Sequence, residues 1–362
     1  MLAHEIGHQL GLPDLYDTYR GMSVIGYWGL MDFGSGVGVV VEDTLTDQSY
    51  YVTGIVPASL CAWSKAFLGW LVPDTARCEG DYSLDAIELQ KGFPSTDALV
   101  VPINSYEYFL IANRQCDIDG DGVGYVLRDT EDSTGVIIGP VDSLRNYNYE
   151  FDFALPGSGL LVWHIDSRMV EWGFPYDVIN AFPERRGVTL VEADGIPDLG
   201  DYNSFYFLGS PYDPFYYGNN DRLDDNTYPH SRSRTGCRSH IIIDQIGPSA
   251  VSMTFRVQYE WGLVTHPFAL GDSLRFGVPS LLVFDFDDDG RDEVAVSLRR
   301  ARWDSTDVVE DTAEVYLLEY SDQGLTLMKA WSRRLRGTYT SVSYTHLRAH
   351  ETRHDLVCRL LL

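Results

Sequence analysis

The most constraining feature of the chain is a short pattern near its start, HEIGHQLGLPD, which runs from His4 to Asp14. His4 and His8 are four residues apart, so on a helix both imidazoles project from one face and reach one metal ion. Glu5 follows the first histidine, where a carboxylate can accept a proton from a metal-bound water. Gly11 permits a helix-ending turn that most residues resist. The turn returns Asp14 as a third ligand, which predicts a zinc site with an open fourth position.

The bare HExxH pattern is a weak signal, because this chain contains it twice. The second copy runs from His350 to His354. Val357 stands where the turn glycine is needed, and Leu360 stands where the third ligand is needed. We therefore interpret the second copy as chance.

Further blocks follow the first motif in a fixed order. With it they are HEIGHQLGLPDLYD from His4, YWGLMDFGSG from Tyr27, LCAWSKAFLGWL from Leu60, EYFLIANR from Glu107, GLLVWHID from Gly159 and RGVTLVEADG from Arg186. Together these blocks resemble the immune-inhibitor-A family of secreted bacterial metallopeptidases. The resemblance implies a zinc endopeptidase with a metzincin-like catalytic domain.

The resemblance also bears on the surroundings of the metal. It supports Asp14 as the third ligand, although Asp17 and Glu42 are acidic alternatives. It implies that Met31 forms an apolar floor beneath the zinc. On the residues alone, Met31 is equally an ordinary core methionine.

The function implied is hydrolysis of peptide bonds in extracellular proteins by a zinc-activated water, with Glu5 as the general base. Protein or peptide substrates and a secreted location follow from the family. The alternative is a non-catalytic cell-surface or adhesion protein, in which the peptidase-like part is a scaffold. Because the zinc motif begins at His4, we expect a fragment truncated at both ends. We expect the signal peptide and half of the cleft to lie upstream and the fragment alone to be inactive.

The predicted fold class is α+β, with four regions along the chain. Residues 1–72 are expected to be the C-terminal part of the catalytic domain, and residues 73–260 a β-rich module. Residues 261–342 are expected to form a partial β-propeller blade, and residues 343–362 a non-native artefact tail. A helix is predicted over residues 59–68 with Ser59 as its cap. Strands are predicted at residues 99–103, 106–111, 159–165, 188–191, 240–246 and 253–259.

The blade prediction rests on one acidic loop. The segment Leu281–Val296 has apolar runs on both sides of the loop and resembles an integrin-type FG-GAP repeat. Carboxylates at its first, third, fifth and ninth positions can surround calcium with hard oxygens. These residues are Asp285, Asp287, Asp289 and Glu293. The alternative is an acidic turn without an ion; with calcium, such a repeat is expected to bind protein or glycan.

Two other acidic groups are weaker calcium candidates. Asp117, Asp119 and Asp121 have the same initial spacing, but the ninth position is a tyrosine, so remote carboxylates or backbone oxygens would have to complete the site. A second group, drawn from the acidic residues near the end of the last family block, consists of Glu192, Asp194 and Asp201. Each group is otherwise a solvated turn.

Composition excludes some partners. The chain has 27 lysines and arginines against 53 aspartates and glutamates, which gives a formal net charge of -26. Nucleic acids and anionic membranes are therefore expected to be repelled. No run of residues is long and apolar enough to span a membrane. The 5 cysteines fit no zinc-ligand spacing, and the choice between disulfides and buried thiols stays open.

Overall fold

The computed structural model describes residues 2–43, 48–76, 79–89, 92–104, 106–120, 150–260, 275–276, 280–285, 291, 293–304, 307–321 and 324–334. The chain divides into two compact units. The first consists of Met1–Arg232 with Arg238–Glu260, and the second of Ser233–Cys237 with Trp261–Leu362. Each unit is described by itself.

The first unit combines short helices with two main sheets. Its helices are α1 (Leu2–Gln9), η1 (Gly26–Trp28), η2 (Phe33–Gly36), α2 (Ala62–Phe67), η3 (Ile87–Leu89), α3 (Ser167–Gly173) and η4 (Phe174–Tyr176). Its strands are β1 (Val39–Asp43), β2 (Gln48–Val52), β3 (Asp74–Thr75), β4 (Gly80–Asp85), β5 (Leu99–Pro102), β6 (Glu107–Arg114), β7 (Gly159–Asp166), β8 (Val188–Val191), β9 (Ile241–Asp244) and β10 (Ser252–Tyr259). The sheets and the few short helices agree with the predicted α+β class.

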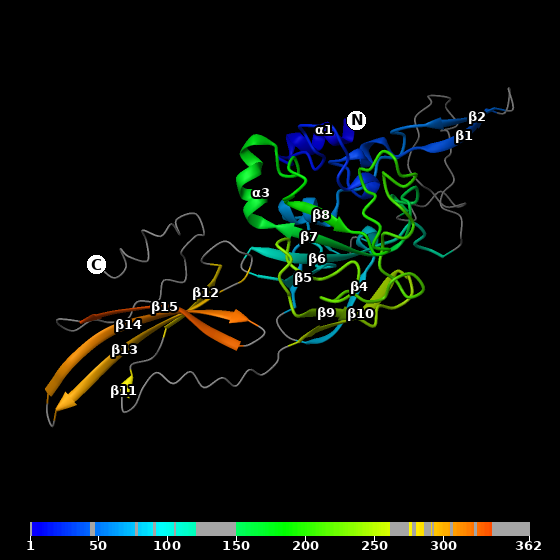
Figure 1. Ribbon diagram of the computed structural model, residues 1–362. Helices are drawn as coiled ribbons and strands as arrows, with labels where there is room; N and C mark the ends of the chain where they lie inside the picture. Colours follow the sequence, from blue (N-terminus) through cyan, green and yellow to red (C-terminus); the bar gives the residue numbers. More distant parts are fainter. Residues whose placement is uncertain are drawn as a thin grey trace. The chain divides into compact units, whose positions relative to one another are not determined.

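The central sheet has the strand order β3-β5-β6-β7-β8. Only the β3–β5 pair is parallel. Figure 1 shows α1 and α3 on one side of this sheet and β4, β9 and β10 on the other. The sheet therefore lies between a helical layer and a second sheet.

The sequence of β7, GLLVWHID, explains this position. Successive side chains of a strand point to opposite faces, so a strand covered on both faces is apolar throughout. Leu161, Trp163 and Ile165 enter the core on the helical side. Leu160 and Val162 enter the core shared with the second sheet. Every residue of β7 is buried.

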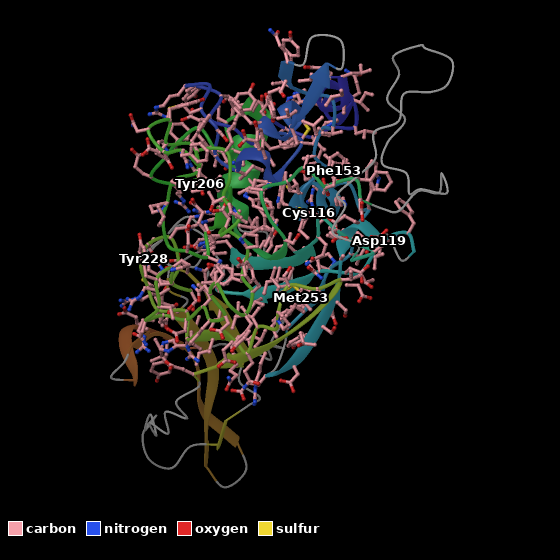
Figure 2. The ribbon with its side chains drawn as sticks, turned by 90° about the vertical axis from the view of Figure 1, so that its right-hand side faces the viewer. Cys116, Asp119, Phe153, Tyr206, Tyr228 and Met253 are labelled. Carbon is pink, nitrogen blue, oxygen red and sulfur yellow. The ribbon has the colours of Figure 1, made fainter. Side chains whose placement is uncertain are left out.

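The second sheet has the order β4-β10-β9 and is antiparallel. Along β10, Met253 (labelled in Figure 2), Phe255 and Val257 face the core, while the alternate residues are more exposed. This is the pattern of a sheet with one covered face. The six predicted strands correspond to β5 to β10, with ends that differ by up to three residues.

The predicted helix over residues 59–68 is shorter in the structure. It spans Ala62–Phe67, and its N-cap is Cys61, which makes no side-chain capping hydrogen bond. Ser59 is therefore not the cap. Its backbone N–H donates to Asp152 at 2.8 Å, and its carbonyl accepts from Leu30, so both groups are used in tertiary contacts.

A buried ionic group lies beside the start of α2. Arg114 Nε is 2.9 Å from Glu88 Oε1, and its Nη2 is 2.7 Å from Asp152 Oδ2. All three side chains are at most 2% exposed. Burial raises the pKa of Glu88 to about 8. Burial also acts to raise the pKa of Asp152, but the charge of Arg114 outweighs it and holds that pKa below its ordinary value.

The second unit is an antiparallel sheet in the residues that the structure describes. Its strands are β11 (Arg275–Phe276), β12 (Ser280–Phe284), β13 (Glu293–Asp304), β14 (Asp307–Ser321) and β15 (Gly324–Arg334). β12 pairs with β13, so the acidic loop joins two neighbouring strands as predicted. Whether this sheet is a propeller blade stays a prediction. The second HExxH copy and residues 343–362 lie outside the described residues.

No helix among the described residues is long and apolar enough to cross a membrane.

We predict that Arg114→Met lowers the free energy of unfolding by about 3–5 kcal/mol, because it leaves two buried carboxylates without their cation. The matched control is Arg222→Met, since the Arg222 side chain is 44% exposed in its ion pairs with Asp224 and Asp244. Its expected cost is about 0–1 kcal/mol. Urea unfolding followed by tryptophan fluorescence measures both, and equal losses would contradict the prediction.

Candidate metal centre

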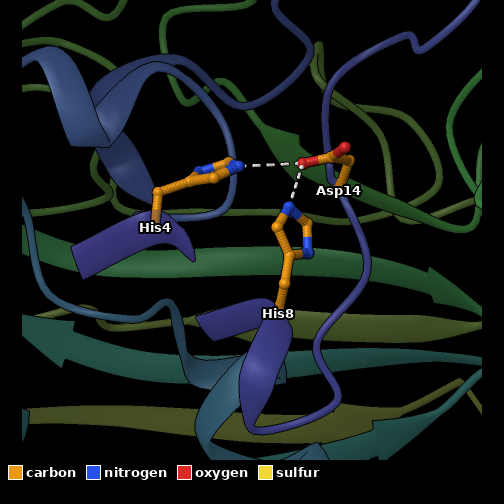
Figure 3. Close-up of side chains that lie close together, drawn as sticks. All are labelled: His4, His8 and Asp14. Atoms are coloured by element: carbon orange, nitrogen blue, oxygen red, sulfur yellow. Dashed lines mark hydrogen bonds and ion pairs between the residues drawn. The ribbon is translucent and has the colours of Figure 1, made fainter. Parts of the chain in front are cut away.

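Helix α1 places His4 and His8 on one face, with their rings 4.8 Å apart and nearly perpendicular. Asp14 Oδ1 lies 3.0 Å from Nε2 of His4 and 3.2 Å from Nε2 of His8 (Figure 3). In a tetrahedral zinc site with bonds of roughly 2.0–2.1 Å, the donor atoms lie roughly 3.3 Å apart. The two distances to Asp14 are therefore close to this spacing, and all three donors lie within 4.8 Å of one another.

The other ring nitrogens explain how the imidazoles are oriented. Nδ1 of His4 lies 2.9 Å from the carbonyl of Leu30, and Nδ1 of His8 lies 2.9 Å from the carbonyl of Leu12. Because a carbonyl only accepts, each Nδ1 carries the proton and donates it. In the neutral rings each Nε2 then presents a lone pair toward the carboxylate of Asp14. Such a donor set repels itself unless a cation stands between its members, so these residues fit a metal ion.

The pKa values of His4 and Asp14 also indicate that these side chains together favour a positive charge between them. The hydrogen bond with Asp14 raises the pKa of His4, against the opposing effect of burial. Burial acts to raise the pKa of Asp14, but hydrogen bonds from His4 and Tyr16 outweigh it and lower that pKa overall. Burial and the hydrogen bond to Asp14 raise the pKa of Tyr16 to about 12. Tyr16 therefore stays protonated and can donate to the carboxylate.

The turn at Gly11 ends α1 and returns the chain. Gly11 has a φ of 96°, in the left-handed region that favours glycine. Its N–H donates to the carbonyl of His8, and the N–H of Leu12 donates to the carbonyl of Gly7, which is the Schellman pattern. The turn thus brings the Leu12 carbonyl to His8 and leads the chain on to Asp14.

Residues far along the sequence hold Asp14 in place. Its backbone N–H donates to Asp177 Oδ1 at 2.9 Å. The next residue, Leu15, donates to the Met31 carbonyl and accepts from Asn180 Nδ2 at 2.7 Å. Sequence reasoning missed Asp177 and Asn180, because no local pattern links a residue to a partner more than 160 positions away.

Met31 lies directly against the metal-binding helix. Its side chain is fully buried, and a methyl group added at Gly7 would overlap its sulfur. A glycine at that position therefore lets Met31 approach the helix backbone between the two histidines. Whether it shapes the metal site, as the family resemblance implies, stays a proposal. Glu5 is exposed beside His4, and its charge is the smallest of the causes that raise the pKa of His4.

Asp17 and Glu42 are the two acidic alternatives to Asp14. Asp17 Oδ1 accepts the N–H groups of Tyr19 and Arg20, and its Oδ2 pairs with Arg20 at 2.8 Å. Asp17 is thus engaged in a turn. The side chain of Glu42 lies outside the described residues.

The predicted calcium residues are only partly described. Asp117 and Asp119, at the end of β6, can each bring a carboxylate oxygen within 4.8 Å of one from Glu150, which is a remote partner of the kind that the loop requires (Figure 2 labels Asp119). Asp121 lies outside the described residues. In the second unit, Asp285 and Glu293 are described, whereas Asp287 and Asp289 are not. Both calcium sites remain predictions.

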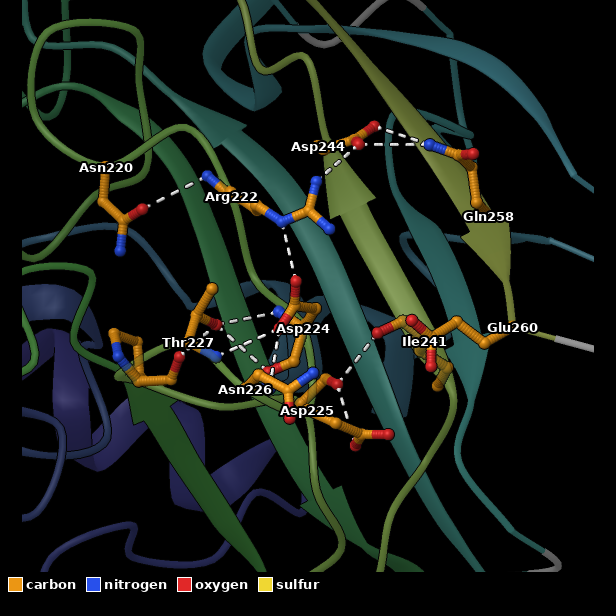
Figure 4. A network of polar contacts seen from close by, with 12 residues as sticks. Asn220, Arg222, Asp224, Asp225, Asn226, Thr227, Ile241, Asp244, Gln258 and Glu260 are labelled. Carbon is orange, nitrogen blue, oxygen red and sulfur yellow. Dashed lines mark hydrogen bonds and ion pairs between the residues drawn. The ribbon is translucent and has the colours of Figure 1, made fainter. Parts of the chain in front are cut away.

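Three other titratable side chains in the described part of the chain form ion pairs within it. His164 lies 2.7 Å from Glu107 Oε2, which agrees with a satisfied core histidine. Arg222 bridges Asp224 and Asp244 (Figure 4). Arg238 similarly pairs with Asp225 and Glu260. Cys61 and Cys116 are free thiols.

Comparison with known proteins indicates the class of protein to which the segment around these residues is similar. Residues 1–63 match the profile of a family described as immune inhibitor A peptidase M6, catalytic domain. The matched segment contains His4, Glu5, His8, Asp14 and Met31. The match therefore indicates a metallopeptidase catalytic segment at the start of the chain.

Two curated relatives are also similar. They are the pre-pro-metalloprotease PrtV from two strains of Vibrio cholerae serotype O1, each 40% identical to this chain over 68 residues. The similar segment covers 18% of this chain and 6% of the relative. No solved structure matches the chain. The sequence blocks from Glu107 onward lie outside the family match, so their assignment to the family stays a prediction.

We predict that Gly11→Ala destabilises the metal centre through the backbone alone, because a methyl group there meets no atom within 4 Å. The left-handed conformation should cost about 1 kcal/mol of folding free energy and weaken zinc binding about fivefold. Gly11→Asn should cost less, since asparagine tolerates this conformation.

Thermal unfolding and zinc titration measure these effects. The control is Gly36→Ala, where a methyl group also meets open space and φ is ordinary. If Gly11→Ala and Gly36→Ala bind zinc equally well, the role of the turn is wrong.

Proposed function

We propose that this chain carries the zinc-binding part of a secreted metalloendopeptidase that hydrolyses peptide bonds of extracellular proteins. The observation that carries the proposal is the convergence of His4 Nε2, His8 Nε2 and Asp14 Oδ1 within a segment that matches a metallopeptidase family. Secretion and extracellular protein substrates are proposed from the family resemblance.

The proposed chemistry assigns one task to each residue. His4, His8 and Asp14 would hold zinc, and Glu5 is an exposed residue of the same helix. Zinc, when bound, supplies a Lewis acid that acidifies water and polarises the scissile carbonyl. Glu5 accepts the proton of the attacking water and delivers it to the leaving amine. Leu30 and Leu12 keep both imidazoles in the orientation that binding needs.

The calcium-dependent parts of the proposal rest on sequence patterns. We propose that Ca²⁺ binds at Asp285, Asp287, Asp289 and Glu293, and that residues 261–342 engage protein or glycan. A further candidate combines Asp117, Asp119 and Asp121 with Glu150. If the first unit were only a scaffold, as in an adhesion protein, its zinc ligands and the exposed Glu5 would have no task.

We predict that the chain binds about one zinc ion and that His4→Ala, His8→Ala or Asp14→Asn each lowers zinc affinity by tenfold or more. Gln9→Ala is the matched control, because Gln9 is an exposed residue of the same helix. Elemental analysis and competition with a chelator measure zinc content and affinity. A chain that holds no zinc, or variants that hold it as well as Gln9→Ala, would rule the site out.

In a protein with the upstream half of the catalytic domain restored, we predict that Glu5→Gln lowers the rate of casein hydrolysis about 10²–10⁴-fold with unchanged zinc content, because the amide retains the shape of the side chain but accepts no proton. Gln9→Glu adds a carboxylate to the same helix and should leave the rate unchanged. Equal hydrolysis by the wild type and Glu5→Gln would exclude Glu5 as the base.

A further inference from the structure

Three carboxylates meet in the segment that follows β8, apart from the zinc ligands. Glu192, Asp198 and Asp213 can each contribute an oxygen, and these oxygens lie within 4.8 Å of one another. Asp213 is fully buried and Asp198 is 8% exposed. This acidic cluster differs from the candidates predicted from sequence, since it contains neither Asp194 nor Asp201.

Each carboxylate uses one oxygen to hold its own position. Glu192 Oε2 accepts the backbone N–H groups of residues 198 and 199 at 2.9 and 3.0 Å. Asp198 Oδ2 accepts from Ser204 Oγ at 2.8 Å. Asp213 Oδ2 accepts from Trp28 Nε1 at 2.8 Å and from the N–H of Ser210 at 2.9 Å. The cluster is thus rigidly anchored by these contacts.

The second oxygens of the two aspartates are left without donors. Asp198 Oδ1 and Asp213 Oδ1 are buried, and no hydrogen bond reaches either atom within the described part of the chain. A buried carboxylate oxygen without a donor or cation is strongly unfavourable. This pair of atoms therefore points to a ligand.

The charge around the cluster leads to the same conclusion. Elsewhere in the first unit, Arg222 bridges two carboxylates (Figure 4), and Arg238 bridges two others. The charge of Glu192 acts to raise the pKa of Arg186, so the two side chains are near each other. Among the described residues, however, Arg186 forms no ion pair with the cluster. Burial, followed by neighbouring carboxylates, raises the pKa of Glu192 to about 8 and of Asp213 to about 7. In the part of the chain that the structure describes, no cation pairs with these three carboxylates.

We propose that Glu192, Asp198 and Asp213 form a structural calcium site. Carboxylate oxygens are hard ligands, which favour Ca²⁺ over zinc. Several carboxylates from one irregular segment suit the flexible coordination of Ca²⁺ better than the strict octahedron of Mg²⁺. The site is distinct from the zinc ligands and does not depend on peptidase activity.

The site also has a mechanical consequence. The acidic segment packs against residues 23–28, because Tyr27 N–H donates to the Leu208 carbonyl and a methyl group at Gly26 would overlap that carbonyl. Trp28, which donates to Asp213, is fully buried. Residues 23–28 lead directly to Leu30, whose carbonyl orients His4. Bound calcium would therefore stabilise residues 23–28, which lead to the carbonyl that orients His4.

The first test measures unfolding of the full chain at pH 8, with zinc bound, in buffer freed of calcium beforehand and in the same buffer with calcium added. At a calcium concentration of about 100 Kd, Tm of the wild type should rise by about 5–10 °C. Asp198→Asn and Asp213→Asn should lose most of this rise, and Asp201→Asn, in the same segment but exposed, should retain it. An equal rise in all four proteins would place calcium elsewhere and overturn the proposal, as would no rise in the wild type.

In calcium-free buffer the expected effect on stability has the opposite sign, because the carboxylates then repel one another. There Asp213→Asn should be at least as stable as the wild type, because its amide oxygen can still accept from Trp28 while one repelling charge is removed. A variant that is less stable without calcium and equally stabilised by it would contradict the site. Asp198→Asn provides the same comparison if Asp213→Asn does not fold.

Terbium provides a direct probe of the site. Tb³⁺ replaces Ca²⁺ at oxygen ligands and emits when a nearby tryptophan is excited. Because Trp28 Nε1 lies 2.8 Å from Asp213 Oδ2, Tb³⁺ in the cluster should emit strongly, and Asp213→Asn should abolish that part of the signal. Emission that calcium does not displace, or that Asp198→Asn and Asp213→Asn leave unchanged, would overturn the assignment.

Discussion

The left-handed turn at Gly11 is the constraint on which the metal centre depends. A helix alone brings His4 and His8 together, but it carries the chain away from them. The φ of 96° at Gly11 reverses the chain within three residues of the helix end. The reversal supplies two things at once: the carbonyl of Leu12, which orients His8, and the carboxylate of Asp14, which completes the donor set.

The centre is also held by parts of the first unit that are remote in sequence. Asp177 and Asn180 fix the backbone on either side of Asp14, and Leu30 orients His4. Asp32 supports that last segment, because its buried carboxylate accepts the N–H groups of residues 24, 25 and 33. Burial raises the pKa of Asp32 to about 6 despite these donors. The ligands are thus local in sequence, whereas their orientation depends on the whole first unit.

This division explains what could be predicted from the sequence. The convergence of the three candidate ligands, the Gly11 turn and the strands β5 to β10 follow from short-range spacing, because helix and strand periodicities act over a few residues. The predicted start of α2 at Ser59 was wrong, because tertiary hydrogen bonds to the backbone of Ser59 override its local preference for capping a helix. The partners Asp177 and Asn180 have no local signal. The acidic cluster was only partly foreseen: Glu192 belongs to it, but Asp213 comes from a later turn.

The proposed zinc centre and the proposed calcium site share one physical principle. In each, a ligand residue commits one polar atom to the protein and leaves another for a cation. His4 commits Nδ1 to a carbonyl and presents Nε2, while Asp213 commits Oδ2 to Trp28 and leaves Oδ1 unpaired. An isolated unpaired atom would be a defect of packing, but several such atoms close together create a strong local field for a cation. Because Trp28 and Leu30 belong to one short segment, the two fields are mechanically connected, and loss of one cation should loosen the ligands of the other.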